Sequence, residues 1–262
     1  MKLPFFQIDA FADRPFGGNQ AAVMPLDAWL PDETLQAIAG ENNLSETAFT
    51  IPAQGDADYD LRWFTPTMEV AMCGHATLAS GHHLIGNRDR VRFRTRKAGV
   101  LTVGRDGDGY TLDLPATVMT PEPHPEVAAA IGAPGAQTFA SNTEAAEGTI
   151  IILLENEAAV RALQPDFKAL GKHHVMAVPT APGDSADIVS RVFVPAFGID
   201  EDPVTGSAHA ALASFWAERL GRNSFSAFQA STRGGHIQCR LDGDRAILGG
   251  KCVTVIEGSF LL

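Results

Sequence analysis

The sequence predicts an α+β protein of two similar lobes, each a largely antiparallel sheet packed around or against a helix. The first observation is a motif, R-x-F-x-P at Arg62–Pro66, that returns 129 residues later at Arg191–Pro195. Each copy is followed by a short loop, a glycine and an alanine-rich helical stretch. Strand-like runs also outnumber helical ones and do not alternate with them as they would in a doubly wound sheet.

Two more matches support a duplicated fold. Gly74 and Gly206, which open the alanine-rich stretches, are 132 residues apart. Leu30–Gly40 is echoed by Leu163–Gly171, about 133 residues later, and half of the 262 residues is 131. The alternative is a chance recurrence of common Pro and Gly turn chemistry. Three matches in one order at nearly constant offset favour a duplication, in which the two lobes are related by pseudo-symmetry.

The elements follow from periodicity and turn residues. Alternating or β-branched runs predict strands at Phe6–Phe11, Val91–Arg94, Tyr110–Leu114, Gly148–Leu153 and Ile188–Val194. The C-terminal part predicts a meander of Gly235–Leu241, Ala246–Leu248 and Cys252–Glu257, separated by glycine turns. Helical patterns occur at Asp32–Gly40, Thr77–Leu84, Ala158–Leu163 and Ala208–Leu220.

A proline-rich stretch separates the two halves. Pro115–Pro125 contains four prolines, which remove backbone donors and favour an extended connector. We place the lobes at residues 1–117 and 118–262. The last C-terminal strand is an alternative contributor to the first lobe.

Charge and composition exclude several classes of protein. The net charge is −11 and the pI about 5.1, which argues against a nucleic-acid or anionic-membrane partner. No apolar run reaches 18 residues, and we read no signal peptide. Three cysteines without a CxxC pair are typical of a reducing cytoplasm. An anionic substrate would need a local positive potential, because the overall field opposes it.

The two glycine-led helix starts are candidates for that potential. Free backbone N–H groups at Gly74 and Gly206 would bind a carboxylate if the lobes face each other across a cleft. The alternative is that each glycine only permits a tight turn, with Thr205 and Ser207 as ordinary N-caps. The pairing of the two turns favours the carboxylate site.

Proton-active side chains cluster near these turns in the sequence. Glu46 lies near the apolar residues Leu44 and Phe49 in the sequence. A carboxylate in such surroundings can act as a general acid and base. The alternative is that Ser45 and Glu46 open a helix. Cys73 and His75 flank the first glycine, and the position of Cys73 at a helix N-terminus favours its thiolate.

The second turn and the histidines leave simpler interpretations open. The acidic run 200–202 precedes the second glycine, where it could equally be a solvated turn. Adjacent histidine pairs lack metal-ligand spacing, so the sequence predicts no metal site.

Several blocks resemble one family of proteins. They are Ile8–Phe11, Gly18-Asn19, Asn43–Glu46, Phe64–Pro66, Gly74-His75 and Glu201–Ala208. In order and over nearly the whole chain, they are similar to the signature blocks of the phenazine-biosynthesis PhzF-like family. The resemblance implies a diaminopimelate-epimerase-like fold, in which each lobe wraps a sheet around a central helix. It also implies a homodimer and catalysis without a cofactor.

The resemblance also implies roles for individual residues. In the family's phenazine enzyme a glutamate moves a proton within a dihydro-hydroxyanthranilate ring, and the matching catalytic residues here are Glu46, His75 and Asp202. The implied substrate-binding residues are Asn19, Cys73, Gly74, Gly206 and Ser207. Cys73 departs from the phenazine enzymes and matches the thiol of diaminopimelate epimerases.

The leading functional hypothesis is a cofactor-independent isomerase that relocates a proton in a small carboxylate-bearing substrate, bound in the interlobe cleft. A second hypothesis is an epimerase or racemase of an amino or hydroxy acid that depends on Cys73. A third is a non-catalytic module that binds a small acid or another protein.

Overall fold

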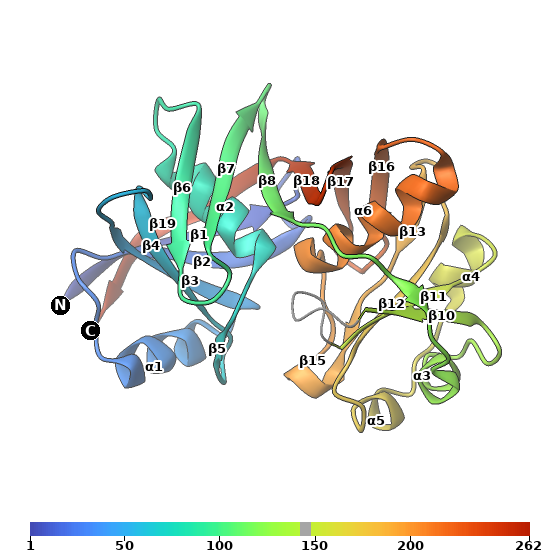
Figure 1. Ribbon diagram of the computed structural model, residues 1–262. Helices are drawn as coiled ribbons and strands as arrows, with labels where there is room; N and C mark the ends of the chain where they lie inside the picture. Colours follow the sequence, from blue (N-terminus) through green and yellow to red (C-terminus); the bar gives the residue numbers. More distant parts are fainter. Residues whose placement is uncertain (142–147) are drawn as a thin grey trace. The chain divides into compact units, whose positions relative to one another are not determined.

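The computed structural model describes residues 1–141 and 148–262 and divides into two compact units (Figure 1). The first unit comprises Met1–Asp113 and Gly249–Leu262, so that the last strand belongs to it. The second unit comprises Leu114–Leu248. Both units combine strands with a few helices, which confirms the predicted α+β class.

The strands of the first unit form one mainly antiparallel sheet. They are β1 (Lys2–Ala10), β2 (Asn19–Pro25), β3 (Glu46–Pro52), β4 (Tyr59–Phe64), β5 (Glu69–Val70), β6 (Arg90–Thr95), β7 (Val100–Asp106), β8 (Gly109–Pro115) and β19 (Cys252–Leu261). Hydrogen bonds join them in the order β19-β1-β2-β3-β4-β6-β7-β8, with β5 beside β4. Only the β2–β3 and β4–β6 pairs among these are parallel.

Helix α2 (Gly74–Leu84) is the central helix of this unit. It contacts β1, β2, β3, β6, β7 and β19, and Figure 1 shows it lying among these strands. Small residues make this possible: every residue from Gly74 to Gly81 is buried. At Gly81 a Cβ atom would lie 2.4 Å from Val103 of β7, so close packing requires glycine there. Helix α1 (Asp32–Asn42) contacts β3 and β4.

The second unit has its own strands and helices. Its strands are β9 (Thr120–Pro121), β10 (Gln137–Ala140), β11 (Thr149–Leu153), β12 (Met176–Pro182), β13 (Ile188–Ser190), β14 (Phe193–Val194), β15 (Ile199–Glu201), β16 (Ser224–Gln229), β17 (Gly235–Asp242) and β18 (Arg245–Gly250). Its helices are α3 (Pro125–Ala130), α4 (Glu157–Ala162), α5 (Phe167–Leu170), the 3-10 turn η2 (Pro195–Phe197) and α6 (Gly206–Leu220). Helix α6 is mostly buried and contacts β17.

In both units, parallel and antiparallel strand pairs follow one another in the same order. The pairs β2–β3 and β11–β12 are parallel, and the following pairs β3–β4 and β12–β13 are antiparallel. The next pairs, β4–β6 and β13–β16, are parallel, and β6–β7 and β16–β17 are antiparallel. The predicted duplication of the fold is therefore confirmed at the level of sheet topology.

The arginine of the repeated R-x-F-x-P motif forms the same kind of ion pair in both units. Arg62 contacts both carboxylate oxygens of Glu69 at 2.8 Å, and Arg191 contacts both oxygens of Glu201 at the same distance. Each guanidinium also lies over the phenylalanine of its own motif, with Arg62 5.0 Å from the Phe64 ring centroid. Planar bidentate pairing and stacking on a ring both require arginine, which explains why the motif survives in both halves.

Three local predictions differ from the structure. The predicted strand Ile188–Val194 is interrupted after Ser190, because β13 and β14 pair separately with β12. The predicted helix from Thr77 begins three residues earlier, at Gly74. The predicted strand Gly148–Leu153 begins one residue later, at Thr149. In the part of the chain that the structure describes, no helix is long and apolar enough to cross a membrane.

Candidate active site

The two glycine-led helices begin in the same way. Cys73 and Thr205 are the N-caps of α2 and α6, and both have extended backbone angles. Neither side chain makes a capping hydrogen bond to its helix. Thr205 is therefore the N-cap by position but without the capping hydrogen bond, and the alternative of Ser207 as an N-cap is wrong because Ser207 is the second residue of the helix. Both helix starts retain the polarity that binds anions.

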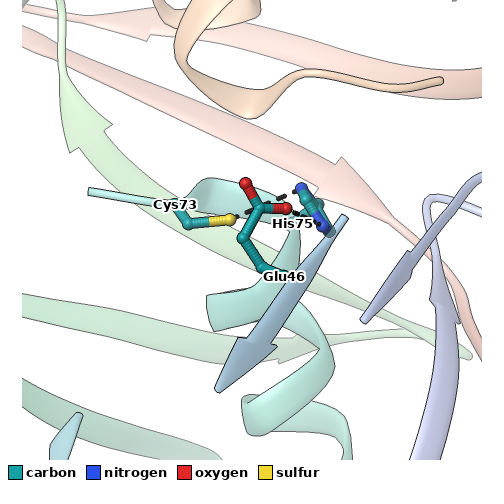
Figure 2. Close-up of side chains that lie close together, drawn as sticks. All are labelled: Glu46, Cys73 and His75. Carbon is teal, nitrogen blue, oxygen red and sulfur yellow. Dashed lines mark hydrogen bonds and ion pairs between the residues drawn. The ribbon is translucent and has the colours of Figure 1, made fainter. Parts of the chain in front are cut away.

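Strand β3 and the start of helix α2 bring Glu46, Cys73 and His75 together. Glu46 is the first residue of β3, which rules out the alternative that it opens a helix. Cys73 precedes α2, and His75 is the second residue of that helix. Figure 2 shows the three side chains pointing toward one another, with the imidazole beside the carboxylate and the thiol. Asn19, the first residue of β2, contacts the same imidazole.

The His75 imidazole is the centre of this group. Its Nε2 lies 3.1 Å from Glu46 Oε2. Its Nδ1 lies 3.5 Å from Cys73 Sγ and 3.2 Å from Asn19 Nδ2. The side chains of His75 and Glu46 are 4% and 17% exposed, so the carboxylate is the more exposed of the two groups.

Burial and charge set the protonation states. Burial, assisted by the negative charge of Glu46, raises the pKa of the Cys73 thiol to about 11. The thiol is therefore protonated near neutral pH, and the expectation that the helix N-terminus favours a thiolate is wrong because desolvation is the larger effect. Burial alone would lower the pKa of His75, but the contact with Cys73 and the negative charge of Glu46 outweigh it and hold that pKa well above its usual value. The imidazole and Glu46 thus form a buried ion pair.

In the second unit the acidic run 200–202 is divided. Asp200 is exposed, and Glu201 forms the ion pair with Arg191. Asp202 is buried and accepts a hydrogen bond from the hydroxyl of Thr205. The prediction of a site residue at Asp202 is compatible with this placement, whereas Asp200 is exposed and Glu201 is held by Arg191.

The start of α6 carries the other predicted residues of the second unit. Gly206 is buried and Ser207 is half-buried, at the first two positions of the helix. The structure therefore places Asn19, Glu46, Cys73, Gly74 and His75 in one group in the first unit. It places Asp202, Gly206 and Ser207 in another group in the second unit.

Sequence reasoning missed two buried residues that hold the second group. Gln229 of β16 accepts a hydrogen bond from the Thr205 N–H at 2.8 Å and donates one to the Asp202 carbonyl at 2.7 Å. His209 Nδ1 lies 2.8 Å from the Thr205 carbonyl. His209 had a signal, because it stands four residues after Thr205 in an alanine-rich helix. Gln229 had none, because the strand pairing alone brings it to the turn.

Comparisons with known proteins agree with this fold. The family model described as Phenazine biosynthesis-like protein (PhzC-PhzF) matches residues 8–258. A Pseudomonas aeruginosa protein named uncharacterized isomerase is 47% identical, with 100% of each chain covered. The human Phenazine biosynthesis-like domain-containing protein is 39% identical, with 99% of each covered.

Comparison with solved structures also shows this fold. A PhzF family protein of Enterococcus faecalis superposes with a TM-score of 0.91 at 39% identity, covering 100% of both chains. A hydroxyproline epimerase from Agrobacterium vitis superposes with a TM-score of 0.62 at 13% identity, covering 98% of this chain and 92% of that one. The second likeness shows a common fold with an epimerase.

Proposed function

Because the chain belongs to the phenazine biosynthesis-like (PhzC-PhzF) family, we propose that it is an isomerase that moves a proton within a small carboxylate-bearing substrate, with Glu46 as acid and base. The observation that carries the proposal is the contact of 3.1 Å between Glu46 Oε2 and His75 Nε2 in a buried setting. A carboxylate held beside an imidazole, and still 17% exposed, can reach a substrate and exchange protons.

The proton balance of the proposed reaction is simple. Glu46 takes a proton from a substrate carbon, which leaves an enolate-like anion and a neutral carboxylic acid. The acid then returns the same proton to another carbon, so that nothing is consumed. The positive charge of the His75 imidazolium and the N–H groups at the start of α2 would stabilise the developing negative charge.

We extend the proposal to the second unit. Gly206 and Ser207 would bind the substrate carboxylate at the start of α6, and Asp202 would assist the proton transfer. This extension is supported by the likeness of the two helix starts, each with an extended N-cap that does not cap its helix.

The test is solvent-deuterium exchange. The protein is incubated in D₂O with a library of small carboxylic acids, and deuterium at carbon is followed by NMR. We expect exchange in the unaltered protein and a loss of roughly 10²–10⁴-fold in Glu46→Gln. Glu41→Gln, an exposed glutamate of α1, is the matched control. Exchange in Glu46→Gln at the rate of the control would remove Glu46 from this role.

A second candidate function is epimerisation with Cys73 as the opposite acid. It is favoured by the 3.5 Å contact between Cys73 Sγ and His75 Nδ1, and a protonated thiol can deliver a proton to a carbanion. Cys73→Ser would then abolish inversion of a chiral substrate, whereas under the leading proposal it lowers exchange less than Glu46→Gln does. Binding of a carboxylate without any exchange would support the third hypothesis, a non-catalytic module.

A further inference from the structure

Three different types of metal ligand converge in the first unit. Glu46, Cys73 and His75 each place one ligand atom within 4.8 Å of the other two. Among residues 1–141 and 148–262, they are the one group of three or more His, Cys, Asp and Glu side chains that does so. Sulfur, imidazole nitrogen and carboxylate oxygen are the ligands that zinc prefers in proteins.

The contact between Glu46 and His75 has an unusual geometry. Oε2 and Nε2 form the ion pair at 3.1 Å, and both atoms are buried without a well-aligned hydrogen bond. Once the proton of the pair has left, each atom can offer a lone pair to a bound cation. Two ligands bound to zinc at roughly 2.0–2.1 Å in a tetrahedral arrangement lie roughly 3.3 Å apart. The observed separation is therefore near that of two ligands of one ion.

We propose that Glu46, Cys73 and His75 form a binding site for a zinc-class divalent cation, with three protein ligands and an open fourth position. The metal would bond to the Glu46 carboxylate, the Cys73 sulfur and His75 Nε2. The thiol proton, and any proton on Nε2, would pass to solvent as these bonds form. The Cys73 sulfur, which lies 3.5 Å from Nδ1, would turn toward the ion at Nε2 to complete the site.

An outer partner for the imidazole is already in place. A histidine bound through Nε2 carries its proton on Nδ1, and that N–H usually donates to a neighbouring oxygen. The Asn19 amide lies against Nδ1, with its nitrogen 3.2 Å away, and it presents its oxygen there once the amide is turned over. Asn19 would thus orient the imidazole toward the metal.

The site implies inhibition of the isomerase by metal. This consequence rests on the proposed function, because a bound cation would occupy the carboxylate of Glu46 that carries the proton. The binding itself rests only on the ligand geometry. Micromolar Zn²⁺ is therefore expected to abolish deuterium exchange, and a chelator is expected to restore it.

Cobalt spectroscopy tests the site independently of activity. The metal-free full chain is titrated with Co²⁺, and we expect one ion per chain with a thiolate-to-cobalt charge-transfer band that one equivalent of Zn²⁺ removes. Cys73→Ser is expected to lose the band, whereas Cys252→Ser, which replaces the half-buried cysteine of β19, is expected to keep it. His75→Gln removes a direct ligand and is expected to weaken binding by more than 10-fold.

A second measurement covers the case in which a variant does not fold. In the unaltered protein, Zn²⁺ should slow alkylation of Cys73 and leave Cys252 unchanged, as followed by mass spectrometry of peptides. The proposal would be overturned if the cobalt band were absent, or if the band persisted in folded Cys73→Ser. It would also be overturned if Cys73 were alkylated at equal rates with and without zinc. If cobalt binds as expected while Glu46→Gln keeps full exchange, the metal site stands and the proposed function fails.

Discussion

Acid should destabilise the second unit through one buried histidine. His209 is fully buried in α6, and Ser190 Oγ lies 3.4 Å from its Nε2. Burial lowers the pKa of His209 to about 4 from its ordinary value of 6.5, although the hydrogen bond to the Thr205 carbonyl acts in the opposite direction. The imidazole is therefore neutral in the folded protein, with Nδ1–H donating to that carbonyl.

The sign and size of the effect follow from linkage. Between pH 6.5 and pH 4 the unfolded chain binds a proton at His209 that the folded chain does not, so the free energy of unfolding falls as the pH falls. The contribution is fully present above pH 6.5 and is lost toward pH 4. At about 1.4 kcal/mol per pH unit, the loss at pH 5 is about 2 kcal/mol, and the full loss is about 3 kcal/mol.

Urea denaturation at pH 7.5 and pH 5 measures this contribution. The control is His209→Asn, whose amide can still donate to the carbonyl but does not titrate. Between the two pH values, the unaltered protein should lose about 2 kcal/mol more than the variant does, because the carboxylates that also titrate are common to both. Equal losses in the two proteins, within about 0.5 kcal/mol, would show that His209 does not have a lowered pKa.

Three further substitutions test the packing by urea or thermal denaturation. Glu69→Ala should cost about 3 kcal/mol because it leaves the buried Arg62 with Asp32 as its remaining hydrogen-bonded carboxylate, and an unchanged stability would contradict the ion-pair argument. Gly81→Ala should cost about 1–3 kcal/mol because its Cβ would overlap strand β7, and a gain in stability would show that the helix can shift. Gln229→Leu should cost at least about 2 kcal/mol because it leaves a buried N–H and a buried carbonyl of the turn before α6 without their side-chain partner, and an unchanged stability would contradict this.

Local chemistry was enough to predict much of the fold. Turn glycines, prolines and hydrophobic periodicity predicted the α+β class, the duplication and most elements, with α6 expected at Ala208–Leu220 and found at Gly206–Leu220. These signals depend on residues close in the sequence, so they are visible before any folding is known. The pairing of Ile188–Val194 was not visible, because the interruption depends on where β12 lies.

Local sequence signals did not predict how the candidate site is assembled. The sequence pointed to Glu46, Cys73 and His75 as separate candidates, but their convergence depends on the pairing of β2 with β3 and on the packing of α2 inside the sheet. The same packing buries Cys73 and raises the pKa of its thiol, against the helix-terminus expectation. It also assembles three zinc-type ligands that histidine spacing did not reveal.

The sequence by itself thus determined the kinds of elements, their repetition and the residue types available for proton transfer. Tertiary structure decided which of those residues meet, which are buried and which charges they hold. The physical reason is the distance along the chain over which each effect acts. Turn and periodicity signals act over a few residues, whereas desolvation and ion pairing act through space between segments that only the folded sheet brings together.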